Sequence, residues 1–441
     1  MPRRFSCRLV ATGPSLQAAQ QGSGEPMTVI QATVIQAEAE SNRAGVQRSE
    51  GRAAPAAGRF AGVHSRAELH ALVAPFAHAD SAKGYLSFAI DLAMFAGGIA
   101  IVLLAPAIAG KIAGGLLAGF GMVALGSLSH EAAHRAVVRS RLGNKIIAVV
   151  SLTVILFNYR LWVYDHHVLH HGRTNVRNAN FYTPLTLAEY RALPAWRRAL
   201  YRAYRSETAL GILLYYVIER WPTVHFWPGE WLPQRFHRSA RGYALLEAAY
   251  AAGLVTLLST VASARGESVM PVLLCGFVLP VTIWFAVFSF TAFLQHTHPR
   301  LRWYHDDAPV GSPPEMLATQ VPLPRWLNHM THYVMEHPVH HISAMVPHYN
   351  LKRAQDALAG IADPALISVP LSLADVRNTL RSCKLYDYEA HVWTDYAGKV
   401  TGIPDDTARA RAAASTSLLP DVADASPGIF FPDTASQPAR A

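Results

Sequence analysis

The stretch PVLLCGFVLPVTIWFAVFSFTAFLQHTHP, residues 271–299, joins a long apolar run to two closely spaced histidines. Its apolar part, residues 271–293, is long enough to cross a bilayer as an α-helix, which takes about 20 residues. His296 and His298 follow directly, and Pro299 disfavours any continuation of the helix beyond them. The stretch therefore predicts a membrane span that ends in histidines.

Three further long apolar runs predict three more spans, at about residues 85–106, 112–130 and 243–263. Two shorter runs, 146–157 and 210–218, are too short to cross and are expected to be interfacial or re-entrant. The alternative, that all of these are buried helices of a soluble protein, fits poorly with the charged content of 16%, because about 25% is usual for soluble proteins.

The distribution of Lys and Arg predicts the orientation. The turn within each pair of spans carries a single basic residue, Lys111 in the first and Arg265 in the second, whereas the region between the pairs is rich in Arg. Because positive charge is retained in the cytoplasm, both termini, the middle region and everything after residue 293 are expected there. The expected fold is all-α and integral to the membrane, with four transmembrane helices in two hairpins and a cytoplasmic helical cap.

The two ends of the chain have a different composition. Residues 1–60 are rich in Ala, Gln, Gly, Ser and Arg without an apolar period, and 401–441 are similar, so both are expected to be disordered. The Arg-rich start can also imitate an organellar transit peptide, and Met27 is an alternative start. Residues 61–400 are expected to form one membrane domain.

Histidines recur in three boxes, HEAAH at 130–134, HHVLHH at 166–171 and HPVHH at 337–341, with His296 as a fourth site. The predicted topology places all four at the same membrane face, and clustered histidines at fixed spacing are typical of metal sites. Nine are expected to be ligands: His130, His134, His167, His170, His171, His296, His337, His340 and His341. His166, His298, His329 and His332 fall outside this spacing and are expected to be bystanders.

Nine imidazoles exceed the four ligands of one zinc ion and suit two metal ions of higher coordination number. Imidazole binds Zn, Cu, Fe and Ni, and a site at the membrane face favours oxygen chemistry on iron. Acceptors behind the ligands are expected to orient the imidazoles. Glu131, Asp165 and Glu336 each adjoin a predicted ligand and are candidates for this role, with a solvated surface charge as the alternative.

With these motifs, residues 80–360 resemble the integral-membrane fatty acid desaturases. FTAFLQHTHPRLRWYHDD and HHISAMVPHYNL look especially like acyl-lipid desaturases that act toward the methyl end of the chain. The resemblance implies a cap that carries a non-haem di-iron site held by the nine histidines. It also implies O2-dependent formation of a double bond in an acyl chain that lies beside the irons. It favours His296 over His298, because the Gln-His pair recurs in the family.

The sequence departs from the family pattern at a few positions. Arg135 stands where a further histidine often follows the first box, and Asn178 and Asn180 stand where an acidic pair often follows the second. These differences leave the substrate and the double-bond position open, and the acyl group can be carried by a glycerolipid, CoA or acyl carrier protein.

Electrons for such a reaction must come from outside the chain. The sequence has no CxxC pair, GxGxxG or HPGG motif, and Cys7, Cys275 and Cys383 are isolated from one another. The expected donor is a ferredoxin or a b-type cytochrome, and the basic face suits such an acidic carrier as well as anionic lipids. Membrane lipids are expected partners and nucleic acid is not.

Three alternatives remain open. A related di-iron hydroxylase, acetylenase or ketolase would use the same histidines. A membrane zinc protease would use HEAAH with Glu131 as the base, and leaves seven histidines unexplained. A histidine-rich metal transporter would place its ligands at mid-membrane depth, away from the predicted face.

Overall fold

Four long apolar helical segments form the part of the chain that is suited to a membrane. The fold is that of a computed structural model, which describes residues 64–177, 180–305, 318–363 and 365–403. The four segments are α4 (Ser81–Leu104), α5 (Ile108–Ala133), α11 (Gln234–Ala264) and the continuous run Val269–His296, which comprises α12 (Val269–Leu273), η5 (Leu274–Val278) and α13 (Leu279–His296). The prediction of four helices long and apolar enough to cross a membrane is confirmed.

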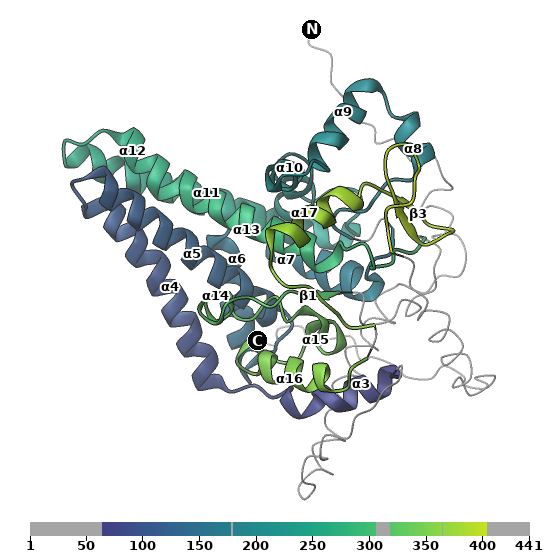
Figure 1. Cartoon of the computed structure of the whole chain (residues 1–441). Helices are drawn as coiled ribbons and strands as arrows, with labels where there is room; N and C mark the ends of the chain where they lie inside the picture. The colour runs from purple at the N-terminus through teal and green to yellow at the C-terminus, as the bar shows by residue number, and fades with distance from the viewer. Residues whose placement is uncertain (1–63, 178–179, 306–317, 364, 404–441) are drawn as a thin grey trace, which may run out of the picture.

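Helix α5 lies between α4 and α13, and glycines allow this close packing (Figure 1). A Cβ at Gly98 of α4 would collide with the backbone of α5 at Ala118, and a Cβ on Gly126 of α5 would collide with the indole of Trp284 on α13. These contacts bury nearly all of the last four turns of α5. The end of α5 that carries His130 is therefore held firmly against α13.

The segment that carries the second histidine box bends sharply. Helix α6 (Arg141–Val154) is followed at an angle of 113° by the run Tyr159–Arg173. That run comprises α7 (Tyr159–Trp162), the π-helical η2 (Val163–His170) and the 3-10 turn η3 (His171–Arg173). Asn158 supports the bend, because its side chain accepts from the N–H groups of Arg160 and Leu161 and donates to the carbonyl of Ala240 on α11. The short apolar run at 146–157, which is expected to be interfacial or re-entrant, thus lies mostly in α6, the first of two helices that meet at this bend.

The remaining helices cover the histidine-bearing end of the long helices (Figure 1). On the N-terminal side these are α3 (Arg66–Val73) and η1 (Ala74–Phe76). In the middle region they are α8 (Leu187–Ala192), α9 (Ala195–Tyr204), α10 (Ala209–Tyr215) and η4 (Tyr216–Phe226). In the C-terminal region they are α14 (Arg325–Met330), α15 (His337–Ile342), α16 (His348–Gly360) and α17 (Leu373–Ser382).

Within the residues that the structure describes, four short strands add to the expected all-helical fold. Strand β1 (Thr319–Gln320) pairs in parallel with β2 (Ile367–Ser368), in the register Thr319 to Ile367. Strand β3 (Leu385–Asp387) pairs antiparallel with β4 (Val392–Thr394), in the register Leu385 to Thr394. Most of the expected disordered ends lies outside the described residues, but 401–403 continue the fold, because the N–H groups of Thr401 and Gly402 donate to the carbonyl of Trp393.

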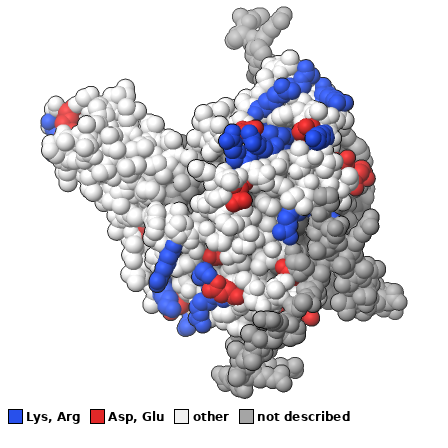
Figure 2. Space-filling model, viewed as in Figure 1, with Lys and Arg blue, Asp and Glu red and all other residues white. Residues whose placement is uncertain are grey.

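The surface of the long helices carries almost no charge (Figure 2). Large apolar side chains such as Leu86, Leu104 and Leu245 are exposed there, as expected for helices in contact with lipid. Charged side chains occur at the end of the long helices that lies away from the histidines. There Glu267, in the turn between α11 and α12, binds both Arg265 of the same turn and Lys111 near the turn between α4 and α5. The other charged side chains in this view lie over the covering helices.

Candidate metal centre

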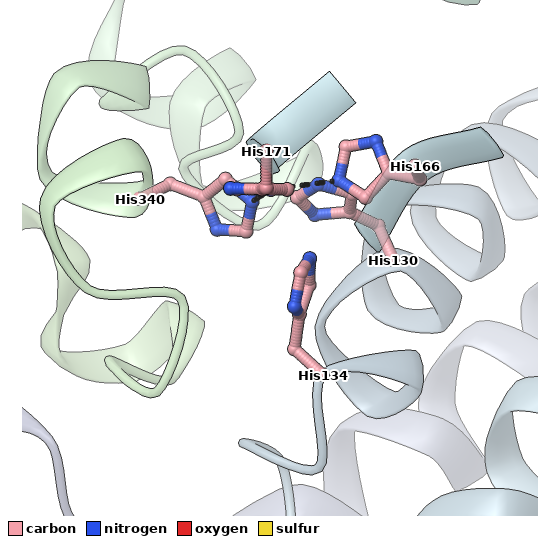
Figure 3. Close-up of side chains that lie close together, drawn as sticks. All are labelled: His130, His134, His166, His171 and His340. Atoms are coloured by element: carbon pink, nitrogen blue, oxygen red, sulfur yellow. Dashed lines mark hydrogen bonds between the residues drawn. The ribbon is translucent and has the colours of Figure 1, made fainter. Parts of the chain in front are cut away.

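Five histidines from four elements form the first histidine group, which comprises His130, His134, His166, His171 and His340. One ring nitrogen of each lies within 4.8 Å of the corresponding nitrogens of the others. His130 and His134 come from the end of α5, His166 from η2, His171 from η3 and His340 from α15 (Figure 3). The Nε2 atom of His171 lies 3.1 Å from that of His166 and 3.0 Å from that of His340.

Four more histidines form the second histidine group, which comprises His170, His296, His337 and His341. Their elements are η2, the last residue of α13, and α15. The Nε2 atoms of His296 and His337 are 2.9 Å apart, those of His341 and His337 are 3.0 Å apart, and those of His170 and His341 are 3.2 Å apart. Each group therefore combines residues that are far apart in the sequence.

Helical geometry decides which histidines meet. Spacings of four on an α-helix place His130 with His134, and His337 with His341, on one face each. Segment η2 is π-helical, with hydrogen bonds from i to i+5, so that residues five apart share a face. His166 and His171 have that spacing, and both lie in the first histidine group.

The grouping differs from the sequence-based prediction at one residue. His166 lies in the first histidine group, where His167 was expected. The ring of His167 stacks on that of His134 at 3.9 Å, and its Nε2 is buried without a hydrogen-bond partner among the described residues. The H-x-x-H-H spacing that favours His167 suits a turn of ordinary width. In the wider π-helical turn of η2, His166 lies on the same face as His171 and so joins the first histidine group.

The other expected bystanders lie outside both groups and have partners of their own. His332 Nε2 pairs with Asp91 at 2.7 Å, and His298 Nδ1 accepts from the backbone N–H of Arg300 at 3.2 Å. The ring of His329 packs on that of Tyr333. The nine grouped histidines are thus the predicted nine with His166 in place of His167.

The donor set fits metal ions. Nε2 of His171 and Nε2 of His337 each lie within hydrogen-bond distance of two other ring nitrogens. Because a neutral imidazole carries only one N–H, these close contacts cannot all be hydrogen bonds, and some of the nitrogens face one another as lone pairs. Burial, assisted by the neighbouring imidazoles, holds the pKa of His337, His340 and His341 well below its usual range. Neutral, buried imidazoles are the form in which histidine binds Zn, Cu, Fe or Ni.

The three carboxylates proposed to orient the imidazoles bind other partners. Glu131 accepts from the backbone N–H of His348 at 2.7 Å and lies 3.1 Å from its Nδ1. Asp165 accepts from Arg220 at 2.7 Å. Glu336 accepts from Gln320 at 2.8 Å and from Asn328 at 2.9 Å. Each carboxylate thus fixes the backbone beside a histidine box to a distant segment.

Two residues that the sequence did not single out as orienting groups contact the imidazoles directly. Asn180 Oδ1 lies 2.6 Å from Nδ1 of His170, and the Asn180 amide donates to the carbonyls of Arg173 and Val176. Thr174 Oγ1 lies 3.3 Å from Nδ1 of His341. Polar residues shortly after the second box were the only sequence signal for these contacts.

An apolar cavity adjoins both histidine groups. His130 and His166 of the first group and His170, His296 and His337 of the second form part of its lining. Its other walls come mainly from α5, α13 and the end of α6 with the turn that follows it, and include Val123, Leu152, Ile155, Phe157, Trp284 and Phe288. Two polar side chains on the wall are hydrogen-bonded, since Ser127 donates to the carbonyl of Val123 and Gln295 to that of Val334. The cavity therefore suits a hydrocarbon chain that passes beside the histidines.

Comparison with known proteins gives a consistent result. Residues 106–369, which contain all nine grouped histidines, match the fatty acid desaturase family. An sn-1 oleoyl-lipid 12-desaturase from Synechocystis sp. is 24% identical over 280 residues, which cover 59% of this chain and 72% of that protein. An sn-1 acyl-lipid omega-3 desaturase (ferredoxin) from Nostoc sp. is 26% identical over 245 residues, 55% of this chain and 66% of that protein. A chloroplastic omega-6 fatty acid desaturase from Spinacia oleracea is 23% identical over 340 residues, 74% of this chain and 69% of that protein.

Proposed function

Because the chain belongs to the fatty acid desaturase family, we propose that it holds two iron ions in its two histidine groups and introduces a double bond into the acyl chain of a membrane lipid. The family makes it an oxidoreductase, and the metal, the lipid and the electron donor are the proposed parts. The observation that supports the proposal best is that residues of both histidine groups line the same apolar cavity.

The roles of the residues follow from this arrangement. His130, His134, His166, His171 and His340 would hold one iron, and His170, His296, His337 and His341 the other. When bound, the iron pair supplies the oxidising power for removing two hydrogens from adjacent methylenes at the expense of O2. The overall reaction converts one saturated carbon–carbon bond into a double bond. It consumes one O2, two electrons and two protons, and it releases two water molecules.

The cavity positions the substrate and excludes water. Its apolar wall binds methylenes through the hydrophobic effect, at about 0.8 kcal/mol for each one buried. The Ser127 hydroxyl and the Gln295 amide on the wall already donate to backbone carbonyls, so a saturated chain takes no hydrogen-bond partner away from them. The part of the chain that lies beside His170 and His296 is the part that would react.

The substrate class and the donor are proposed by similarity. The relatives described above are named for oleoyl-lipid and acyl-lipid substrates, and one of them for ferredoxin. We therefore expect an acyl-lipid substrate and a ferredoxin-like donor. Figure 2 shows Lys and Arg side chains gathered on one exposed surface, with a few acidic side chains among them, and such a surface suits an acidic carrier. Arg202 of α9 and Arg381 of α17 are exposed, and Arg381 binds Glu207.

One experiment tests metal and reaction together. The chain is expressed in a host with a simple lipid profile, purified for metal analysis, and the host lipids are examined by mass spectrometry with localisation of double bonds. We expect about two irons per chain and a new double bond. His337→Ala should lose both, whereas Lys352→Ala, at an exposed site, should lose neither. One tightly bound zinc and unchanged lipids would contradict the proposal.

The same products separate the alternatives. A hydroxylated, acetylenic or keto product in place of the alkene would assign the related di-iron reaction. The zinc protease receives little support, because the Glu131 carboxylate is bound by His348 and because three other histidines share the group of His130 and His134.

A further inference from the structure

A row of buried polar side chains, joined by two hydrogen bonds and one longer contact, lies beside the first histidine group and has no part in the reaction described above. It consists of Tyr216, His225, Asp165 and Arg220, of which the first three are at most 2% exposed. The Tyr216 hydroxyl lies 2.7 Å from Nδ1 of His225. Nε2 of the same ring faces Asp165 Oδ2 at 3.6 Å, and Arg220 donates to the other oxygen of Asp165 at 2.7 Å.

The surroundings assign the protons in this row. An N–H on Nε2 of His225 points to the carboxylate of Asp165, which is the favourable tautomer, so Nδ1 is left as an acceptor. The Tyr216 hydroxyl then donates to Nδ1. Burial raises the pKa of Tyr216 well above its usual value and lowers the pKa of His225, so that the phenol keeps its proton and the imidazole is neutral. A phenol that donates to a neutral imidazole can pass its proton along an existing hydrogen bond.

Aromatic rings connect this row to the first histidine group. The indole of Trp162 stacks on the ring of His166, with centroids 4.8 Å apart and planes within 7°. The same indole lies 5.5 Å from the ring of His225, and that ring lies 5.7 Å from Tyr216. Electron transfer weakens steeply with distance, and these ring-to-ring steps are all short. The path from the first group to Tyr216 therefore runs through rings that are nearly in contact.

We propose that Tyr216 is a redox-active residue that reduces the oxidant formed from O2 at the histidine groups when no acyl chain is present to react. This inference rests on the proposed function, which supplies that oxidant. In the step, the Tyr216 O–H bond breaks, its proton forms a new N–H bond at Nδ1 of His225, and its electron passes through Trp162 to the oxidant, which is reduced by one electron. The products are a neutral tyrosyl radical and an imidazolium that faces Asp165.

The site is reset by the same donor that drives desaturation. One electron from the carrier reduces the radical, and the proton returns from His225 to the phenolate oxygen. The consequence is protection, because an oxidant strong enough to attack a methylene would otherwise attack the aromatic wall of the cavity, such as Phe157 and Trp284.

The chain provides a matched control in Tyr182. This tyrosine is also buried, at 4% exposed, and its hydroxyl donates to the backbone carbonyls of Ile212 and Ser289 at 3.1 and 3.3 Å. A carbonyl oxygen is a poor proton acceptor, so Tyr182 lacks the base that Tyr216 has. Loss of one hydroxyl at either position changes the packing to a similar extent.

The test is rapid-freeze EPR on the full chain loaded with iron. The protein is reduced with dithionite and mixed with O2 in the absence of an acyl substrate. We expect a tyrosyl radical, identified by narrowing of its signal in protein made with ring-deuterated tyrosine. Tyr216→Phe should lose the signal and Tyr182→Phe should keep it. His225→Asn, which retains an acceptor for the hydroxyl but no base, should also lose it.

A second measurement separates this inference from the proposed function. With an acyl substrate present, the wild type and Tyr216→Phe should form product at equal initial rates, but Tyr216→Phe should lose activity faster on exposure to O2 and donor without substrate. If the wild type forms product and gives no tyrosyl radical, or if Tyr216→Phe keeps the full signal, the inference is overturned. A wild type without iron or product would overturn the proposed function and this inference with it.

Discussion

His166 and His167 are adjacent in the sequence, and the structure gives them different surroundings. Nε2 of His166 lies 3.1 Å from that of His171 in the first histidine group, whereas His167 stacks on His134 outside it. In a π-helix the turn is wider than in an α-helix, so a ligand pair can be five residues apart. The identity of the ligand at this position is therefore a question of helical register.

We predict that His166→Ala lowers the iron content by about one ion per chain, because the first group loses one of its five nitrogens and its shortest link to η2. His167→Ala should retain both irons, because the His167 ring stacks on that of His134 and belongs to neither histidine group. Metal analysis of the two purified variants compares them directly. Loss of iron in His167→Ala with full iron in His166→Ala would restore the register expected from the sequence.

Asn180 gives a second prediction at this scale. Its Oδ1 fixes the ring of His170 through Nδ1, and groups of this kind change metal affinity by about 10- to 100-fold when they are removed. Asn180→Ala should therefore weaken iron binding at the second histidine group, as measured by competition with a chelator. Asn180→Asp keeps an acceptor at the same place and should bind iron more tightly than Asn180→Ala. Equal affinities for the wild type and Asn180→Ala would assign Asn180 to backbone support alone.

The turns of the long helices are joined by a polar contact. Lys111 at the start of α5 is 5% exposed, and its ammonium binds Glu267 in the turn before α12 and the carbonyl of Val102. Arg265 also binds Glu267 and donates to the carbonyl of Leu104. Because Lys111 lies beside the first turn and Glu267 and Arg265 come from the second, their ion pairs hold the pair α4 and α5 in place against α11 and α12.

We predict that Lys111→Met lowers the melting temperature of the detergent-solubilised protein by several degrees. The variant removes the buried cation that joins Glu267 to the carbonyl of Val102, and Arg265 then remains as the partner of Glu267. Loss of one partner of a buried ion pair is destabilising in proteins. The control is Lys83→Met, since Lys83 pairs with Asp80 at 3.9 Å on an exposed surface where ion pairs contribute little. Equal melting temperatures for the two variants would show that the contact between the turns is dispensable.

At the scale of the whole molecule, the turns and the histidines occupy opposite ends of the long helices (Figure 1). The basic residues follow the same division, because the covering helices carry many arginines and the turns few. We therefore propose that the histidine end and its covering helices face the cytoplasm.

This orientation predicts opposite reactivity for two introduced cysteines. In a chain whose Cys7, Cys275 and Cys383 are replaced by Ala, Ser268→Cys lies in the exposed turn between α11 and α12, and Glu389→Cys lies beyond β3. In intact cells an impermeant maleimide should label Ser268→Cys, and Glu389→Cys only after permeabilisation. The reverse pattern would invert the orientation, and labelling of both in intact cells would exclude a membrane crossing.

Much of the fold follows from local sequence. Runs of about 20 apolar residues identify the four long helices without reference to the rest of the chain, because the bilayer requires that length. The histidines are found in the same way, since HEAAH and HPVHH display helical spacing within a few residues. Together with the second box and the Gln-His pair at 295–296, these motifs contain eight grouped histidines that were expected from the sequence, and the family was expected from their resemblance to it.

Only the tertiary structure decides how these parts meet. The division of the histidines into two groups depends on the packing of α5, η2, α13 and α15, and η2 sends His166 and His170 to different groups. The pairing of β1 with β2 and the contact of Asn180 with His170 likewise depend on where the backbone has already been placed. The physical reason is that spacing in a sequence defines the face of one helix, whereas a site built from several elements is defined by the angles at which they pack.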